Sequence, residues 1–291
     1  MRMLGIVIVN YLSAADTAGL VRSLAAHHTD PGVAVTIAVV DNSDQRTELE
    51  AVVELARQHG ISGRVLHGHG NVGYAAGNNL GAACLLEAGA EVVWVLNPDT
   101  RITGGKVGAA LDVGQPDDRA IGATTSVGAD GVGHPDLGAL DLWTGQSGQP
   151  VTGGTGGSRT LTYVAGHSVL VTRRAWLDLG GFSEDFFLFY EEADLAVRAA
   201  GLGIPTVVIP DLVVRHAGGG ATGATSDLRA KSTITYLHAS RSCMIFFRKH
   251  HPLRLPLALT ARLGYAGKAL LVGGPRAASA ILRGMVAGLR A

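Results

Sequence analysis

"EVVWVLNPDT", residues 91–100, is a run of apolar, β-branched and aromatic residues that ends in Asn97, Pro98 and Asp99. An apolar run without alternation indicates a strand that is buried on both faces, as in a parallel sheet. Pro98 lacks a backbone donor and ends the pairing, so Asp99 is expected just beyond the strand. A lone carboxylate there is costly inside a protein unless a positive group meets it. The stretch therefore predicts both a parallel sheet and a charged site at its edge.

Further apolar stretches alternate with helical patterns on either side: "LGIVIVNY", "VAVTIAVVDNS", "RVLHG" and "RAIGATTSV". The intervening helices are expected near residues 16–28, 47–59, 75–88 and 105–113. This alternation predicts an α/β fold, a doubly wound and predominantly parallel sheet with helices on both faces. Ligands gather at the carboxyl ends of the strands in such sheets.

The second half of the chain is less regular. Residues 128–157 contain ten glycines and predict a long loop over the site rather than a second domain. A short helix is expected over residues 173–179, and another helix begins near Tyr190. Two short strands, "TVVIP" and "LVVRHA", come next, and the pattern is helical from residue 228 to the end.

Composition favours a globular protein, with 47% hydrophobic and 16% charged residues among 291. Cys84 and Cys243 lie far apart and outside any CxxC pair, which favours free thiols in a reducing, cytoplasmic compartment. No stretch reaches the roughly 18 uncharged apolar residues of a membrane-spanning helix. The first apolar run is interpreted as a strand and not as a signal peptide.

A net charge of zero hides a strong asymmetry. Residues 228–291 hold 11 Lys and Arg and no acid, whereas residues 1–227 hold the other 13 and all 24 acids. This split predicts a catalytic domain, residues 1–227, and a basic helical C-terminal extension, residues 228–291, that meets an anionic surface. Nucleic acid is not favoured as the partner, because the basic residues are not interleaved with aromatic ones.

The end of this extension has the pattern of a helix that lies in a membrane interface. Its basic and apolar residues recur at helical spacing: Arg276, Arg283 and Arg290, with Leu282, Met285 and Leu289. The pattern predicts peripheral attachment to the inner membrane face through residues 252–291. The alternative is a helix packed on its own domain or on the second subunit of a homodimer, because charged stems also cover apolar surface.

Two strand ends carry candidate ligands. Asp99 suits a divalent cation bound to a diphosphate, because Mg²⁺ takes one or two protein oxygens and completes its shell with phosphate and water. "VVDNS", residues 39–43, delivers Asp41 to the same edge of the sheet, where it can accept hydrogen bonds from a nucleobase or ribose. The alternative for both residues is turn or cap chemistry.

"GHGNVGYAAGNN", residues 68–79, contains a GxGxxG pattern that ends at Gly73. This pattern does not follow the first strand, so the context of a dinucleotide-binding motif is absent. The preferred interpretation is a loop in which Asn71 and Asn78 present amides to a nucleotide and glycine lets the backbone approach it. A plain helix-entry loop is the alternative.

"FYEEADLAVR", residues 189–198, places Glu191, Glu192 and Asp194 in the first turn of a helix. Acids there suit the helix dipole, so a structural role is one interpretation. The aromatic "DFFLF" just before them can form an apolar wall beside a carboxylate, which favours a general base. His216 follows a short strand and can complete a metal site begun by Asp99, although a structural histidine is the alternative.

In this order, "VIVNY", "VVDNS", "NVGYAAGNN", "LNPDT", "GGFSEDFFLFYEEADLAVRAAGLG" and "RHAGGGAT" resemble the inverting family 2 glycosyltransferases. The resemblance covers residues 4 to about 222. It is strongest to the group that includes rhamnosyltransferases acting on lipid-linked or polymer acceptors. It implies the GT-A fold, a nucleoside-diphosphate sugar as donor, and Mg²⁺ or Mn²⁺ as cofactor.

The resemblance also implies roles for individual residues. Nucleotide-sugar contacts are expected at positions that match the family motifs: Asn10, Asp41, Asn71, Gly73, Asn78, Asn97 and Asp99. Asp99 is the implied metal ligand, with His216 as a second. Glu192 occupies the place of the catalytic base, with Glu191 before it and Asp194 after it. Two positions depart from the family pattern, because Asn97 replaces the first acid of the DxD-type element and Glu192 stands where Asp is more usual.

The implied reaction is a single in-line displacement in which Glu192 deprotonates an acceptor hydroxyl that attacks the anomeric carbon. Deoxythymidine-diphosphate rhamnose is the donor suggested by the subgroup, with a glycan, glycolipid or small-molecule natural product as acceptor. The alternatives are a nucleotidyltransferase, whose expected basic glycine-rich loop is absent, and a catalytically silent nucleotide-sugar-binding protein. Asp99, Glu192 and His216 are expected to surround one pocket.

Overall fold

The computed structural model describes residues 1–128, 131–149, 159–218 and 227–291. Two compact units form, each with its own hydrophobic core. The first, which we call the sheet unit, comprises Met1–Asp136, Val164–Phe182 and Arg198–Ala217. The second, the helical unit, comprises Leu137–Tyr163, Ser183–Val197 and Gly218–Ala291. The boundary between residues 227 and 228, which the charge asymmetry predicts, stays a prediction.

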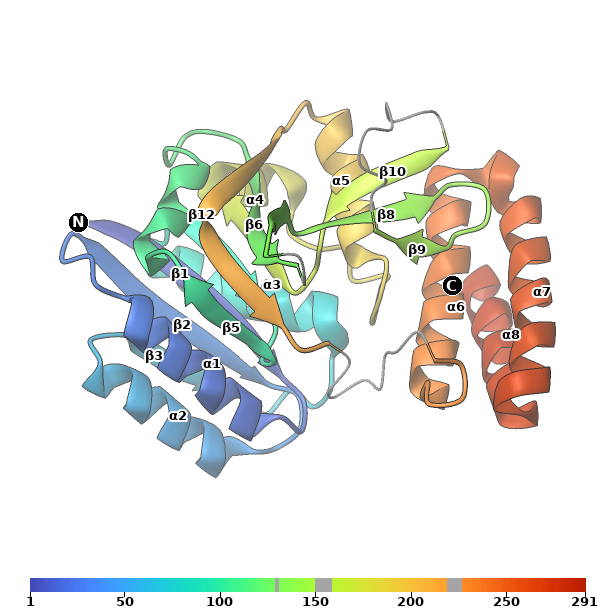
Figure 1. Ribbon diagram of the computed structural model, residues 1–291, viewed down its shortest axis with the longest axis horizontal. Coiled ribbons are helices and arrows are strands. Elements are labelled where there is room, and N and C mark those ends of the chain that lie inside the picture. Colours follow the sequence, from blue (N-terminus) through green and yellow to red (C-terminus); the bar gives the residue numbers. More distant parts are fainter. Residues whose placement is uncertain (129–130, 150–158, 219–226) are drawn as a thin grey trace. The chain divides into compact units, whose positions relative to one another are not determined.

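The sheet unit is built on a sheet with the strand order β3-β2-β1-β4-β11-β6-β12-β5, and β7 pairs with β6 (Figure 1). The strands are β1 (Arg2–Asn10), β2 (Val33–Asp41), β3 (Ser62–Leu66), β4 (Val92–Leu96), β5 (Thr100–Gly104), β6 (Ile121–Val127), β7 (Gly133–Pro135), β11 (Ser168–Thr172) and β12 (Thr206–His216). Strands β3, β2, β1 and β4 are parallel, whereas β11 is antiparallel to both of its neighbours. The predicted, predominantly parallel α/β sheet is confirmed.

Helices cover both faces of this sheet. They are α1 (Ala14–His27), α2 (Arg46–Gln58), α3 (Gly73–Glu87), the 3₁₀ helix η1 (Val107–Val113) and α4 (Arg173–Leu179). On one face, Ile6 and Ile8 of β1 join a core with Leu20 of α1. On the other face, a Cβ atom at Gly81 of α3 would lie 2.5 Å from the side chain of Val7. The alternation along β1 therefore buries one set of residues under each layer, as an apolar run without polar positions requires.

Two expectations about the second half of the chain are wrong. Residues 129–130 and 150–158 lie outside the described part of the chain. The rest of the glycine-rich region contains β7 and two strands of a small second sheet. Such strands are too short to show a periodic pattern. "TVVIP" and "LVVRHA" are one strand, β12, whose register shifts between Val208 and Val213. A bulge of this kind lets a strand pass a proline without ending.

The helical unit combines the small sheet with the C-terminal helices (Figure 1). Its elements are β8 (Leu137–Asp141), β9 (Ser147–Gly148), β10 (Thr160–Val164), the start of α5 (Glu191–Gly201), α6 (Thr233–His250), η2 (Pro252–Arg254), α7 (Leu255–Gly273) and α8 (Pro275–Arg290). The expectation of a helical C-terminal extension is confirmed. Glycines bring α8 close to α6, because a Cβ atom at Gly284 would lie 2.2 Å from the Leu237 carbonyl oxygen.

The apolar stripe predicted for α8 is divided between two environments. Met285 is buried in the core with residues of α6, whereas Leu282 and Leu289 are 44% and 38% exposed. One face of α8 therefore packs on its own unit, which the amphipathic pattern alone did not distinguish from a membrane-facing surface. In the part of the chain that the structure describes, no helix is both long enough and apolar enough to cross a bilayer.

Candidate active site

The carboxyl ends of β1 and β2 form one corner of the sheet unit, where Asn10 and Asp41 are partners in the register. Asn10 is fully buried, and its Oδ1 accepts hydrogen bonds from the hydroxyls of Ser13 (3.0 Å) and Thr17 (3.1 Å). Its Nδ2 donates to Ser43 and Gln45, both at 3.1 Å. Asn10 therefore uses both ends of its amide to fix the loops that follow the two strands.

Asp41 keeps a vacant acceptor at the same corner. Its Oδ1 accepts hydrogen bonds from the backbone N–H (3.0 Å) and hydroxyl (3.2 Å) of Ser43. Its Oδ2 is buried and has no hydrogen-bond partner within residues 1–128, 131–149, 159–218 and 227–291, and the residue is only 2% exposed. Because a buried acceptor without a partner is costly, this oxygen is suited to receive an N–H or O–H group of a ligand.

Two neighbouring amides repeat this arrangement. Asn42 Nδ2 donates to the carbonyl oxygen of Gly73 (3.0 Å), and Asn78 Nδ2 donates to that of Tyr74 (2.9 Å). The Oδ1 atoms of Asn42 and Asn78 are buried and have no hydrogen-bond partners among the residues that the structure describes. Asn42 was not among the predicted site residues, although it stands beside Asp41 in "VVDNS".

The loop before α3 has the geometry of a helix entry. Asn71 is exposed, and its Oδ1 accepts a hydrogen bond from the backbone N–H of Gly73 (3.1 Å). Gly73 has a φ of 86°, a conformation that residues with a Cβ rarely adopt. The helix-entry alternative thus describes the local structure, and contact of Asn71, Gly73 and Asn78 with a nucleotide stays a prediction.

Asp99 and His216 meet in the sheet unit, as expected. Asn97 and Asp99 lie in the turn between β4 and β5, closed by a hydrogen bond from Thr100 N–H to the Asn97 carbonyl oxygen (3.1 Å). Strand β12 runs antiparallel to β5 and places His216 opposite Thr100. His216 Nε2 consequently lies 3.1 Å from Asp99 Oδ1.

A second histidine supports this pair. The ring of His167 stacks on that of His216, with centroids 4.4 Å apart and planes inclined by 8°. On its other side, His167 Nε2 lies 3.6 Å from Asp136 Oδ1. Burial raises the pKa of Asp136, but the neighbouring His167 and a hydrogen bond from Thr124 outweigh it and lower the pKa. No sequence pattern pointed to His167, because its partners come from distant strands.

The chemistry of Asp99 and His216 fits a divalent cation. Carboxylate oxygen and imidazole nitrogen are both ligands of Mn²⁺, and a carboxylate suits Mg²⁺. Among the described residues, no group of three or more His, Cys, Asp and Glu is arranged to hold a metal. Two protein ligands would leave the rest of a cation's coordination sphere to a diphosphate and water, and metal binding by Asp99 and His216 stays a prediction.

In the helical unit, α5 begins with the carboxylates of Glu191 and Glu192 after a strained turn. Phe189 and Tyr190 have φ values of 68° and 71°, which cost free energy for residues with large side chains. The hydroxyl of Tyr190 donates to the carbonyl oxygen of Gly145. Arg262 of α7 donates to the same carbonyl oxygen (3.1 Å) and to the Tyr190 hydroxyl (2.8 Å). The C-terminal extension thus holds the residue just before the carboxylates.

Glu192 lines a pocket of about 530 Å³ that lies entirely within the helical unit. Glu192 is half-buried, its Oε2 has no hydrogen-bond partner among the described residues, and burial raises its pKa. Of the aromatic "DFFLF" stretch, only Phe189 lines this pocket, and Tyr190 lines it as well. Glu191 does not line the pocket, and burial and the charges of Glu192 and Asp194 raise its pKa. The geometry therefore favours Glu192 as the base.

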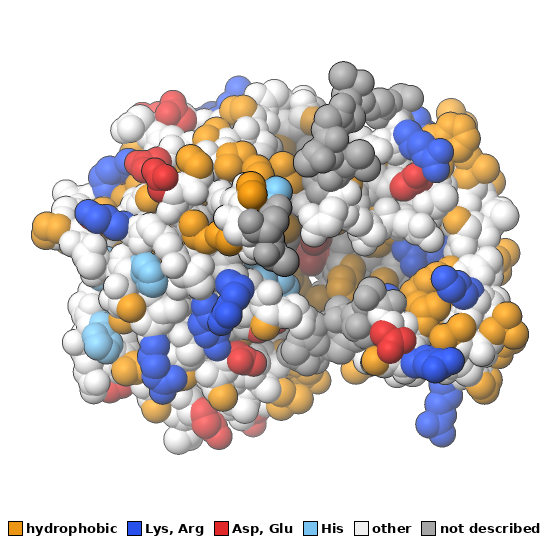
Figure 2. Space-filling view, in the orientation of Figure 1, with side chains coloured by type: hydrophobic (Ala, Val, Ile, Leu, Met, Phe, Trp, Pro, Cys, Tyr) orange, Lys and Arg blue, Asp and Glu red, His pale blue; other side chains and the backbone are white. Residues whose placement is uncertain are grey.

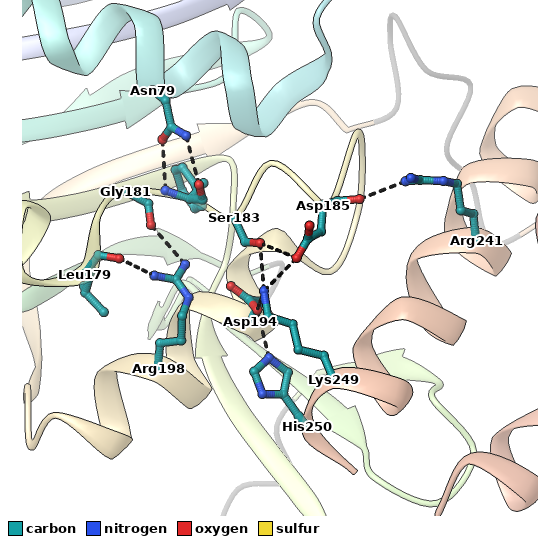
Figure 3. A network of polar contacts seen from close by, with 11 residues as sticks. Asn79, Leu179, Gly181, Ser183, Asp185, Asp194, Arg198, Arg241, Lys249 and His250 are labelled. Carbon is teal, nitrogen blue, oxygen red and sulfur yellow. Dashed lines mark hydrogen bonds and ion pairs between the residues drawn. The ribbon is translucent and has the colours of Figure 1, made fainter. Parts of the chain in front are cut away.

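Asp194 is fully buried and supports α5 from the other side (Figure 3). Its Oδ1 lies 2.8 Å from His250 Nε2 and 3.2 Å from Lys249 Nζ, both on α6. Lys249 also donates to the Ser183 hydroxyl (2.8 Å) and to Asp185 (2.9 Å). Asp194, which the family resemblance placed among the catalytic residues, thus joins α5 to the C-terminal helices rather than lining the pocket.

The "GGF" turn of the sheet unit, residues 180–182, is held separately (Figure 3). Arg198 donates to the carbonyl oxygens of Leu179 (2.7 Å) and Gly181 (3.0 Å). Asn79 exchanges two hydrogen bonds, each 2.9 Å, with the backbone of Phe182. These contacts give Asn79, the second asparagine of "GNN", and Arg198, the arginine of "LAVR", a structural role.

Two solved structures share the fold of this chain. The mannosyltransferase PcManGT from Pyrobaculum calidifontis, in complex with GDP-Man and Mn2+, has a TM-score of 0.56 at 15% identity, over 99% of this chain and 88% of that one. GalNAc-T7, in complex with UDP, GalNAc and Mn2+, has a TM-score of 0.52 at 13% identity, over 85% and 50%. The fold is therefore that of the GT-A glycosyltransferases.

The family follows from the sequence comparisons. Residues 2–234 match the family described as "Glycosyltransferase like family 2", and the chain belongs to it. The low-salt glycan biosynthesis hexosyltransferase Agl10 of Haloferax volcanii is 28% identical over 67% of this chain and 61% of its own length. The N-acetylglucosaminyl-diphospho-decaprenol L-rhamnosyltransferase of Mycobacterium tuberculosis is 33% identical over 27% and 26%. The chain thus spans less than two thirds of the length of either relative, and its rhamnosyltransferase-like character is confirmed.

Proposed function

We propose that this glycosyltransferase moves a sugar from a nucleoside diphosphate to an acceptor hydroxyl with inversion, and that Glu192 is the base. The observation that carries the proposal is the Glu192 carboxylate at the wall of a 530 Å³ pocket, whose Oε2 has no partner in the part of the chain that the structure describes. Burial raises its pKa toward the value at which a carboxylate accepts a proton most effectively near neutral pH. A single displacement by the deprotonated hydroxyl inverts the anomeric centre.

On the donor side, the sheet unit supplies the polar groups. The vacant acceptors of Asp41, Asn42 and Asn78 are suited to the N–H and O–H groups of a nucleoside. Asp99 and His216 would hold Mg²⁺ or Mn²⁺, and a bound cation would neutralise the charge that develops on the departing diphosphate. Deoxythymidine-diphosphate rhamnose is the donor we propose, in keeping with the rhamnosyltransferase among the relatives.

For the acceptor we propose a lipid-linked glycan, because the name of that relative specifies a sugar joined to decaprenol through a diphosphate. Peripheral attachment to an anionic membrane would bring such an acceptor to the enzyme. Figure 2 shows hydrophobic and basic side chains next to one another over the C-terminal helices. Leu253 of η2 and Leu271 of α7 are 95% and 87% exposed. A second subunit is the alternative occupant of this surface.

Thermal unfolding with a panel of nucleoside diphosphates, with and without Mn²⁺, tests the donor side. A ligand at about 100 times its Kd adds roughly 2.7 kcal/mol to the unfolding free energy, a shift in Tm on the order of 5–10 °C. We expect one base to be preferred, Mn²⁺ to enlarge the shift, and Asp99→Ala to abolish the Mn²⁺ effect. Asp112→Ala, at an exposed position, is the matched control. A metal-independent shift, equal in Asp99→Ala, would contradict the assigned metal ligands.

A further inference from the structure

The pocket beside Glu192 has a positive character that the proposed chemistry does not use. Arg262 of α7 and Lys231, which precedes α6, both line it. Among the described residues, no Asp or Glu oxygen lies within 4.0 Å of the charged nitrogens of either side chain. Even with Glu192 ionised, the two cations leave the pocket with a net positive charge.

Within the described part of the chain, Arg262 has no counter-ion. Its Nη2 donates to the Gly145 carbonyl oxygen and to the Tyr190 hydroxyl, whereas its buried Nε has no partner among the described residues. Burying a cation without a carboxylate is costly, and neutral acceptors offset that cost only in part. The vacant Nε–H group is therefore a donor that a bound anion can satisfy.

Lys231 stands among aromatic rings on the same pocket wall. Its Nζ lies 3.2 Å from the Tyr265 hydroxyl, 5.7 Å from the ring centroid of Tyr236 and 5.9 Å from that of Tyr265. Arg262 lies 5.8 Å from the ring of Tyr265 as well. The same tyrosine thus contacts both cations. The rings keep the ammonium and guanidinium groups in place without neutralising them.

We propose that Arg262 and Lys231 form an anion subsite for a phosphoryl group of the acceptor, whose hydroxyl is then within the pocket that contains Glu192. The inference rests on the proposed role of Glu192 and adds the residues that would bind the phosphoryl group of the acceptor. A guanidinium fork with an ammonium group suits the several oxygens of a phosphate or diphosphate better than a single carboxylate. The aromatic residues of the pocket provide the apolar surface for the group that carries it.

Calorimetric titration of the full chain in EDTA, without nucleotide, tests the subsite with farnesyl diphosphate and inorganic pyrophosphate. We expect Lys231→Gln to raise the Kd about tenfold or more, as the loss of one charge-assisted hydrogen bond does. Lys268→Gln, exposed on α7 and outside the pocket, should leave the Kd within about twofold of the native value. If farnesyl diphosphate binds tightly and pyrophosphate does not, the ligand of the subsite is a lipid-linked phosphate. If pyrophosphate binds equally tightly, the ligand is a free phosphate or diphosphate. Both results support the subsite.

Three results would overturn the proposal: an unchanged Kd in Lys231→Gln, farnesol binding as tightly as farnesyl diphosphate, or farnesoate binding equally well. Arg262→Lys keeps the charge but loses the Nε–H donor, so it should weaken binding while thermal unfolding confirms that the variant is folded. Asp99→Ala should lose metal-dependent nucleotide binding and keep farnesyl diphosphate binding. If the native chain failed to bind nucleotides while its binding of farnesyl diphosphate still depended on Lys231, the proposed function would be wrong and the subsite would be supported.

Discussion

Replacing Glu192 with glutamine removes one proton acceptor and leaves the shape of the pocket almost unchanged. The Oε2 atom of Glu192 has no hydrogen-bond partner, so the substitution breaks no internal contact at that oxygen. A positioned general base contributes about 10²- to 10⁴-fold, which corresponds to roughly 3–5 kcal/mol of activation free energy. We therefore expect kcat to fall by that factor, while binding of the nucleoside diphosphate stays unchanged.

The pH dependence of this variant supplies a second, independent measurement. Burial raises the pKa of Glu192 above 4.5, so the activity of the native chain should rise with pH through that raised pKa. The Glu192→Gln variant should lack this limb of the profile. The same shift makes the folded state retain a proton, so its contribution to stability is complete below pH 4.5 and is lost as pH rises through the folded-state pKa. At neutral pH, Glu192→Gln should accordingly be at least as stable as the native chain.

Glu191→Gln is the comparison variant, because Glu191 is buried one position away and does not line the pocket. Its kcat should fall by less than about tenfold, well short of the effect of losing a general base. Transfer is measured by donor consumption with the nucleotide that the unfolding panel selects. Near-native turnover of Glu192→Gln, or an equal loss in Glu191→Gln, would refute the assignment of the base.

Further predictions concern the C-terminal helices. Asp194→Asn leaves Lys249 and His250 without their shared carboxylate and should lower the free energy of unfolding by about 2–4 kcal/mol. The loss is at the low end for a buried ion pair because Lys249 is 34% exposed. Calorimetry should show a Tm lower by roughly 5–10 °C. Gly284→Ala places a methyl group against the α6 backbone and should lower the free energy of unfolding in urea by about 1–3 kcal/mol. Gly267→Ala, whose methyl group meets open space, should not destabilise the protein. Equal stabilities of the two variants would contradict the packing of α8. Leu271→Glu should reduce sedimentation with anionic vesicles without changing Tm, and undiminished binding would argue against a membrane-facing surface.

The donor side of the site illustrates what an individual sequence pattern can predict. An apolar run that stops at a proline or at a polar cluster defines both a buried strand and the residue at its end, so Asp41 and Asp99 could be assigned to one edge of the sheet. The start of α5, which lies at Glu191, was predicted near Tyr190. Burial along one element has a period that the sequence displays directly.

Contacts between distant segments have no such period. The strand pattern "VIVNY" does not show that the Asn10 amide forms hydrogen bonds with Ser13, Thr17 and Ser43. The stripe on α8 did not show that Met285 faces a core while Leu282 faces outward, because both belong to one amphipathic pattern. Strands of the small sheet were missed because two to five residues cannot establish an alternation.

By itself, the sequence determined the alternation of strands and helices, the polar residues at the strand ends and the carboxylates that open α5. Tertiary structure alone decided that Asp194 pairs with α6 and that Glu192 shares its pocket with Arg262 and Lys231. The physical reason is that a side chain's place on its own helix or strand follows from local periodicity. Its partners follow from close packing between segments far apart in the chain, which no local pattern records.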